Sequence, residues 1–481
     1  MALKSKGRHL LLFLSAIPRV WLSFSLFIGT FFFIVFCVYR KLHDGSDGDV
    51  GYYFYRLGVI SWSDLLTALF VRPADAVFIF GRWRPIPELL FKAFYVSPLN
   101  AMQIHMAFWG VVGLQCLAFS WGMVRLLSLG FKLPSGSTFI LASLIWASEP
   151  LAISSSVPLS FCGTTTNLMF FGFLGVAVEK LLTSKKKNKW FVAVFFSALF
   201  CCHSHETSWF LLFWLSGWLY VLKRKEFWWP SAFVIVYLAV FRSFLPSHDG
   251  GVLRLIVGES LLRRGVSHLT YCLLLAFNGI QHPISDLIQL PAGEGLDITP
   301  GNNALAFLLT VVAVYLASKF KAKPAHFRLW SYLSITLGIG LVFSTSPFWL
   351  TAGYLLSYFV VIPSAFLASW VLVSSYGRAK PSWIPIGLLL VGNMIATYWA
   401  TTQWNFTDLN TTYTRQFADA VIANPETKGC SVTAPCCLDI DRADPGRSAW
   451  SIAWNQGGER QPAFIPIDQP DRSCVRTIKI H

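Results

Sequence analysis

Residues 20–39 read VWLSFSLFIGTFFFIVFCVY, a run of twenty residues without a charge. A helix needs about 20 mostly apolar residues to cross the hydrocarbon core of a bilayer. Similar segments recur along most of the chain, and 54% of its 481 residues are hydrophobic while only 13% are charged. This composition excludes an ordinary soluble domain. It predicts an all-α polytopic membrane protein.

The apolar segments predict about eleven transmembrane helices. We expect them at residues 20–39, 103–124, 137–154, 165–183, 190–204, 207–222, 229–246, 302–318, 329–346, 353–375 and 383–401. We find no tandem repeat, no glycine-rich nucleotide-binding loop and no Walker motif in the sequence.

Charge predicts the orientation of these helices. Four basic residues precede the first span, and every second later turn also carries Lys or Arg, which favours a cytoplasmic N-terminus. The same alternation explains much of the +15 formal charge without a nucleic-acid partner. We therefore expect a transmembrane domain at 1–401 with exported loops at 40–102 and 247–301, and an exported C-terminal domain at 402–481.

The first exported loop opens with an acidic, glycine-rich turn, HDGSDGDVGYY, at residues 43–53. A carboxylate held beside lipid headgroups could act as a general base; the alternative is a solvated loop. Its acids, Asp44, Asp47 and Asp49, leave room for a divalent metal. The turn lacks the distant Glu of a calcium loop, however, and we expect no cofactor.

Residues 61–72 follow as a short amphipathic segment. Ser61 with Asp64 is typical of a helix start, and the apolar residues that follow share one face at helical spacing. This pattern predicts a helix lying on the membrane surface. An ordinary packed helix is the alternative.

Two arginines, Arg82 and Arg84, flank Trp83 just before Pro85. The planar guanidinium group of arginine suits phosphate oxygens. The pair therefore predicts a phosphate-binding site or, alternatively, an anchor to bulk lipid headgroups.

The order of these features resembles that of the C-type (GT-C) membrane glycosyltransferases, closest to the protein O-mannosyltransferase-like and lipid A aminoarabinose-transferase-like branches. An acidic motif precedes Tyr52, an amphipathic helix and an Arg-Pro pair at Arg84 follow, and His105 enters the second span. Glu149, at the outer end of the third span, is similar to a later acidic turn of those families. The stretch HSHET at 203–207 resembles their Lys-Glu-Thr signature, with His in place of Lys.

The resemblance covers about the first 225 residues and implies an inverting transferase. Such an enzyme moves a sugar from a polyprenyl-phosphate carrier to a glycan, lipid or protein acceptor on the outer face of the membrane. By resemblance, Asp49 is the base because it stands three residues before Tyr52, and Asp47 is the second choice. The resemblance also implies phosphate contacts from Arg84 and its neighbour Arg82, and an outer pocket edge formed by His205 and Glu206.

This chemistry is coherent for a hydroxyl acceptor. A carboxylate can remove the proton of a weak nucleophile as the new bond forms, and cations stabilise the departing phosphate. The loop 247–301 begins near His248 and carries Arg263 and Arg264 around a predicted amphipathic helix at 253–264. We interpret it as a lid that adds phosphate contacts; simple headgroup contact is the alternative.

The tail is polar and rich in cysteine. The pattern predicts a helix at 408–423 and strands at 449–454 and 474–480, in a small α+β domain that needs disulfide support. A bond between the adjacent Cys436 and Cys437 is geometrically unfavourable, so two pairings with Cys430 and Cys474 stay open. A zinc site is the rival interpretation. The other six cysteines lie in or beside apolar segments, where we expect packing residues.

Together these features favour a multi-pass glycosyltransferase of a bacterial cytoplasmic membrane, with its active site on the periplasmic face. Its partners would be a polyprenyl-phosphate-linked sugar, an acceptor and membrane lipids. A flippase or transporter for lipid-linked glycans, and a polymerase or ligase that uses pyrophosphate-linked donors, are the alternatives. An inverted repeat would favour the transporter, and none is evident.

Overall fold

The structure is a computed structural model, and sixteen parts of the chain are described. They are residues 20–37, 61–70, 84–95, 101–148, 158–185, 187–205, 207–242, 277–278, 304–319, 326–337, 361–376, 382–403, 425–427, 436–440, 464–466 and 477–480.

These parts are mostly helical. The first helix is Val20–Cys37, and a later helix covers 326–337. The labelled α-helices are α3 (Trp62–Thr67), α4 (Pro85–Tyr95), α5 (Ala101–Ser128), α6 (Ser137–Trp146), α8 (Pro158–Thr183), α9 (Asn188–Ser204), α10 (Ser208–Val221), α11 (Trp229–Tyr237), α14 (Ala304–Ser318), α16 (Val361–Tyr376) and α17 (Ile384–Gln403). Short turns of other helix types lie at η2 (Lys225–Trp228), η3 (Leu238–Arg242) and η5 (Pro425–Thr427).

Each of the eleven predicted apolar segments overlaps one of these helices. Within the described residues, three helices are long and apolar enough to cross a membrane: Val20–Cys37, Met106–Ser128 and Thr165–Thr183. The helical, membrane-type character of the chain is therefore confirmed, while the number of spans and their orientation stay predictions.

One predicted span is wrong in extent. We expected a helix over 137–154, but α6 ends at Trp146 and the chain turns at Ala147. Pro150 explains this, because its ring would clash with the carbonyl of the residue four positions earlier, which is Trp146. The last carbonyls of α6 therefore need partners from elsewhere.

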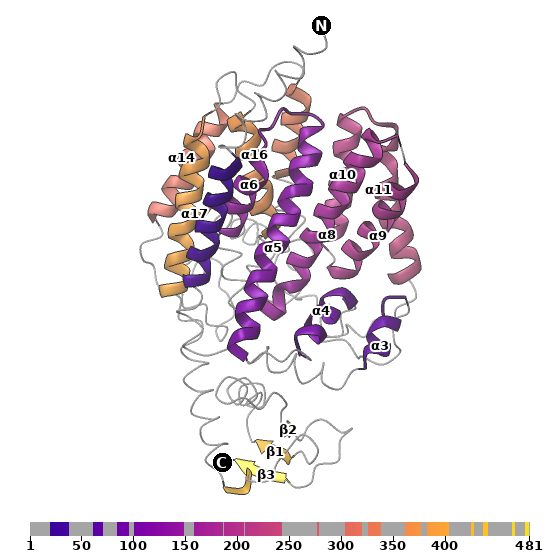
Figure 1. Cartoon of the computed structure of the whole chain (residues 1–481), viewed down its shortest axis with the longest axis vertical. Coiled ribbons are helices and arrows are strands. Elements are labelled where there is room, and N and C mark those ends of the chain that lie inside the picture. Colours follow the sequence, from indigo (N-terminus) through magenta and orange to yellow (C-terminus); the bar gives the residue numbers. More distant parts are fainter. Residues whose placement is uncertain are drawn as a thin grey trace, which may run out of the picture.

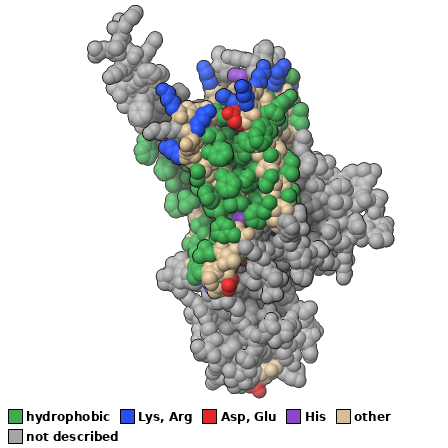
Figure 2. All heavy atoms as spheres, turned by 90° about the vertical axis from the view of Figure 1, so that its right-hand side faces the viewer, with side chains coloured by type: hydrophobic (Ala, Val, Ile, Leu, Met, Phe, Trp, Pro, Cys, Tyr) green, Lys and Arg blue, Asp and Glu red, His purple; other side chains and the backbone are tan. Residues whose placement is uncertain are grey.

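The helices form one bundle (Figure 1). Figure 2 shows a broad band of hydrophobic side chains on the face of α9, α10 and α11, with Lys and Arg gathered above it. The exposed basic residues of this end include those around the start of α9 and just after α10: Lys185, Lys187, Lys189, Lys223, Arg224 and Lys225. The two short helices α3 and α4 lie at the opposite end (Figure 1).

The hydrophobic band is made of large side chains that a soluble protein would bury. They include Phe191, Phe195 and Phe196 on α9, Phe213 on α10, and Ile235 and Val236 on α11. In a bilayer these side chains would face lipid tails, which are as apolar as they are.

Helices α5 and α8 cross with their backbones in close contact. A Cβ atom added at Gly122 would collide with the carbonyl of Gly172, and one added at Gly172 would collide with that of Ala118. At Gly175 an added Cβ would lie 2.8 Å from the Gly122 carbonyl oxygen. Only glycine allows this approach, which is typical of helix packing within membranes.

The other half of the bundle is joined by side-chain hydrogen bonds. Asn393 and Thr397 of α17 donate to the carbonyls of Leu144 and Ala147, both at 2.8 Å. These are the carbonyls that the early end of α6 leaves without helical partners. The amide of Asn278 donates to Asn393 (2.7 Å) and to Thr310 of α14 (2.9 Å). Polar side chains of α17 thus complete the end of α6.

A small parallel sheet lies beyond the end that carries α3 and α4 (Figure 1). Its strands are β1 (Cys436–Ile440), β2 (Phe464–Pro466) and β3 (Thr477–Ile480), in the order β2-β1-β3. The pairs Cys437↔Ile465 and Cys437↔Thr477 set the register. β3 falls within the strand predicted at 474–480, whereas the predicted helix 408–423 and strand 449–454 lie outside the described residues.

The cysteines divide as expected where the structure describes them. Cys37, Cys116, Cys201 and Cys202 are buried cysteines that form no disulfide, as expected of packing residues. Cys436 is buried and disulfide-bonded. The side chain to which it is bonded is not among those described, so the pairing of the tail cysteines stays a prediction.

Candidate functional site

The predicted start of the amphipathic helix is confirmed. The Asp64 N–H donates to Ser61 Oγ (3.1 Å), and the Ser61 N–H donates to Asp64 Oδ2 (3.3 Å). This reciprocal pair satisfies two donors that a helix start leaves open. α3 buries Leu65 and exposes Trp62 and Leu66, and Phe70 is exposed in the turn that follows it, so the three exposed side chains lie four residues apart. An apolar stripe of this kind suits a membrane interface.

His203, at the end of α9, holds α3 against the bundle. Its Nε2 lies 2.8 Å from the Leu69 carbonyl oxygen, and its Nδ1 lies 3.0 Å from the Tyr237 hydroxyl. A carbonyl only accepts, so Nε2 carries a proton and donates. The Tyr237 hydroxyl also lies 3.2 Å from the Cys202 carbonyl, to which it can donate. Both nitrogens of this buried ring are therefore used to join α3, α9 and α11.

His205 follows α9 in an extended conformation (φ −165°, ψ 151°) and is only 2% exposed. The Thr207 N–H donates to its Nδ1 (3.2 Å), and the Thr207 hydroxyl lies 3.0 Å from the same nitrogen. A backbone N–H only donates, so Nδ1 is the acceptor and the proton of the neutral ring is on Nε2. This arrangement makes His205 a fixed neutral donor, in contrast to the charged lysine of the signature it resembles.

Asn167 of α8 supports this arrangement. Its Nδ2 donates to Thr207 Oγ1 (2.7 Å), and its Oδ1 accepts from the Cys201 thiol (2.7 Å). A chain of hydrogen bonds thus runs from Cys201 through Asn167 and Thr207 to His205. Asn167 was not among the predicted site residues, although an amide inside an apolar helix is a signal of function or of helix pairing.

Arg84 stands directly before α4 and is half-buried. Pro85 begins the helix because its fixed φ suits the first turn and the residue before it favours an extended backbone. Pro85 and Pro87 have no N–H groups, so the start of α4 offers few backbone donors to an anion. Any phosphate bound here would depend on the guanidinium of Arg84.

α4 buries two charged side chains, Glu88 and Lys92, which are one turn apart and 4% and 6% exposed. The helix packs against α8 and α9. Burial lowers the pKa of Lys92 from its ordinary value. A lowered pKa means that folding disfavours the ammonium form, so this lysine makes the fold more stable as pH rises through the lowered pKa toward 10.5.

Most predicted site residues lie outside the described part of the chain. They are Asp44, Asp47, Asp49, Tyr52, Arg82, Glu149, Glu206, His248, Arg263 and Arg264. His105 lies in α5, where the structure describes its backbone but not its side chain. Arg84, directly before α4, and His203 and His205, at the end of α9, lie at the same end of the bundle, where α4 packs against α9. The acidic turn stays a prediction.

No group of three or more His, Cys, Asp or Glu side chains that could hold a metal occurs among the described residues. The three aspartates considered as metal ligands are not among them.

Comparisons with protein-family models, with curated proteins and with solved structures find no match to this chain.

Proposed function

We propose that the protein is an inverting glycosyltransferase that moves a sugar from a polyprenyl-phosphate donor to a glycan, lipid or protein acceptor at the outer face of a bacterial cytoplasmic membrane. One observation supports this most: the capped helix α3, Arg84 before α4, and the turn with His203 and His205 gather at one end of the bundle. These are the described parts of the pattern that resembles the GT-C enzymes.

The proposed topology has eleven spans, with the N-terminus inside and the disulfide-containing C-terminal domain outside. The concentration of exposed lysines and arginines at the end opposite α3 supports this orientation, because basic turns stay in the cytoplasm. The apolar stripe of α3 would then lie in the outer interface, close to the headgroup of a lipid-linked donor.

In the proposed reaction, Asp49 removes the proton of the acceptor hydroxyl while its oxygen bonds to the anomeric carbon. The bond from that carbon to the phosphate oxygen breaks, and the polyprenyl phosphate leaves with the electron pair, which inverts the anomeric centre. Asp47 is the second candidate for the base. Arg84, with Arg82 and the lid arginines, would neutralise the leaving phosphate, and the Nε2 proton of His205 would donate to one of its oxygens.

Asp49→Asn tests the base. We expect turnover to fall by about 10²–10⁴-fold, because an amide cannot accept the proton, while donor binding stays nearly unchanged. The assay uses the full chain in lipid nanodiscs with a panel of polyprenyl-phosphate sugars and candidate acceptors, and follows release of the carrier by mass spectrometry.

Asp64→Asn is the matched control, since it makes the same change in the same loop and the amide oxygen of asparagine can still accept a hydrogen bond from the Ser61 N–H. It should keep turnover near that of the wild type. Normal turnover in Asp49→Asn would move the base to Asp47 or defeat this mechanism. No carrier release by the wild type with any donor would favour a flippase or a pyrophosphate-dependent polymerase or ligase.

Arg84→Ala tests the phosphate contact. We expect the apparent Kd for the donor to rise about tenfold or more, since a charge-assisted hydrogen bond is worth about 1.5–3 kcal/mol. Arg125→Ala is the control, because Arg125 is an exposed arginine near the end of α5. An unchanged donor affinity in Arg84→Ala would assign Arg84 to lipid anchoring.

A further inference from the structure

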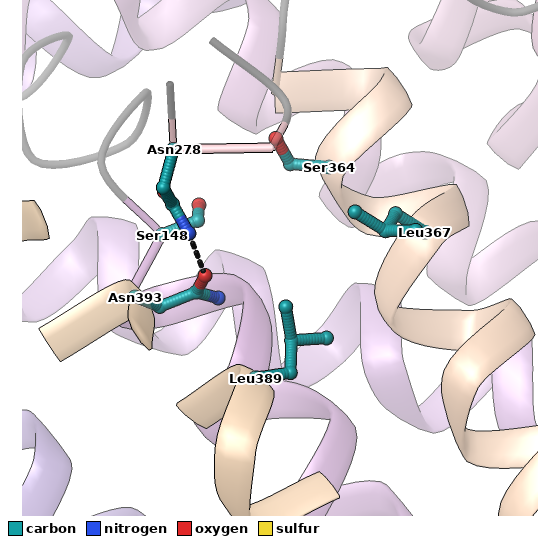
Figure 3. A pocket seen from close by; sticks show the side chains of 6 residues that line it. All are labelled: Ser148, Asn278, Ser364, Leu367, Leu389 and Asn393. Atoms are coloured by element: carbon teal, nitrogen blue, oxygen red, sulfur yellow. Dashed lines mark hydrogen bonds between the residues drawn. The ribbon is translucent and has the colours of Figure 1, made fainter. Parts of the chain in front are cut away.

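A small polar cavity lies where α6 ends, between Asn278 and the helices α16 and α17 (Figure 3). Its lining is contributed by Ser148, Asn278, Ser364, Leu367, Leu389 and Asn393. Its volume is about 10 Å³, close to the space that one water molecule requires. We propose that this cavity binds a single structural water molecule that links the end of α6, Asn278 and the start of α16.

The first argument is the Ser364 hydroxyl. It lines the cavity, is 7% exposed, and has no hydrogen-bond partner among the described residues. A buried hydroxyl without a partner is costly. In a bundle surrounded by lipid, the cost is not relieved by bulk water at the surface.

The second argument is the geometry of the other polar groups. Ser148 uses its proton on the Ile145 carbonyl (2.7 Å), so its oxygen is left as an acceptor. Asn278 donates both Nδ2 protons, one to Thr310 and one to Asn393. Its side-chain carbonyl oxygen, Oδ1, accepts no hydrogen bond in the described part of the chain. The cavity therefore presents two acceptors and one hydroxyl donor.

A water molecule matches this set. It can donate to Ser148 Oγ and to the Asn278 carbonyl and accept from Ser364, which is the three hydrogen bonds typical of buried water. Leu367 and Leu389 close the apolar side of the cavity (Figure 3). This inference does not depend on the proposed transferase activity.

The test compares Ser364→Ala with Ser375→Ala in the full chain in nanodiscs. Ser375 is a matched control because it is also on α16, is buried, and has a hydroxyl without a partner among the described residues, yet it is not part of the cavity lining. We expect Ser364→Ala to lower the apparent Tm by roughly 1–3 °C, because the Ser364 hydroxyl is the group that donates a hydrogen bond to the proposed water. Ser375→Ala should leave the Tm unchanged or raise it.

The direction in which Ser364→Ala changes the apparent Tm decides between a hydrated and a dry cavity. If the cavity is dry, removing the unpaired hydroxyl relieves its cost and the Tm rises, which overturns the proposal. Replacing choline chloride with NaCl at constant ionic strength should leave the wild-type Tm unchanged; stabilisation by Na⁺ would identify an ion in place of water.

A density map of the wild type provides an independent readout if the variant does not fold. We expect one peak roughly 3 Å from Ser364 Oγ, Ser148 Oγ and the Asn278 carbonyl oxygen. No peak, or a peak with the shorter contacts of a coordinated cation, would contradict a bound water.

Discussion

The two halves of the bundle are held together by different means. Where α5 crosses α8, Gly122 and Gly172 let backbone touch backbone. Where α6 meets α17, Asn393 and Thr397 reach across to backbone carbonyls. Inside a membrane no hydrophobic force distinguishes a neighbouring helix from lipid, so close packing and hydrogen bonding must provide the specificity. The contact of α5 with α8 depends on the absence of side chains, whereas the contact of α6 with α17 depends on particular polar side chains.

The difference follows from helix length. α5 and α8 are long, with 28 and 26 residues, and their central backbone groups are satisfied within the helix. α6 has ten residues and ends inside the bundle, so its last carbonyls need outside donors. Close packing suits two complete helices, whereas an interrupted helix requires polar partners.

The largest effect should come from Gly172→Ala. The new methyl group would collide with the Ala118 carbonyl and would lie 2.6 Å from the Phe119 Cα, so the helices must separate. We expect the free energy of unfolding to fall by about 3 kcal/mol or more. The fall should be seen as less monodisperse protein in fluorescence-detected size exclusion and as a lower apparent Tm.

Gly110→Ala on α5 is the control, because no atom lies within 4 Å of its added Cβ. It should be neutral or slightly stabilising. Gly392→Ala on α17 makes the same change in the other half, where the nearest atom is the Thr310 hydroxyl at 3.0 Å. If it were as damaging as Gly172→Ala, the contrast between the two halves would not hold.

Asn393→Ala should have the next largest effect. It leaves the Leu144 carbonyl without its donor and one Asn278 N–H without its acceptor. We expect a loss of about 1–3 kcal/mol in stability, measured as the apparent Tm of the purified protein. A double-mutant cycle with Asn278→Ala should show that the two losses are not additive, and full additivity would refute direct coupling.

Thr397→Val should have the smallest effect. It keeps the side-chain volume and removes the hydroxyl that donates to the Ala147 carbonyl. Single hydrogen bonds between membrane helices are worth about 0.6 kcal/mol on average. The expected fall in Tm is therefore near the limit of detection, and a loss as large as that of Asn393→Ala would mean that Thr397 has a further role.

The sequence was sufficient to predict the positions of the apolar helices, because long apolar runs leave few alternatives in a membrane. It also predicted the start of α3, since a capping box is a local interaction between Ser61 and Asp64. The early end of α6 could have been predicted from Pro150, but the apolar run on both sides of Glu149 concealed it.

The partners of buried polar residues could not be predicted. Asn167 and Asn393 are single amides in apolar helices, and nothing local specifies that one pairs with Thr207 and the other with Leu144. Such pairs depend on which helices become neighbours. Of the candidate site, sequence found the two histidines and Arg84, but it did not find the hydrogen bonds that fix the two rings.

The capping of α6 by α17 also constrains how the chain is made. Asn393 and Thr397 are separated from the carbonyls they bond by 249 and 250 residues. At a translation rate of about 5–20 residues per second, these donors emerge from the ribosome roughly 12–50 s after α6 does. During that interval the end of α6 must find temporary partners, such as the insertion machinery, water or lipid headgroups. A nascent chain arrested before α17 would thus carry a membrane segment that quality-control proteases can recognise as unfinished.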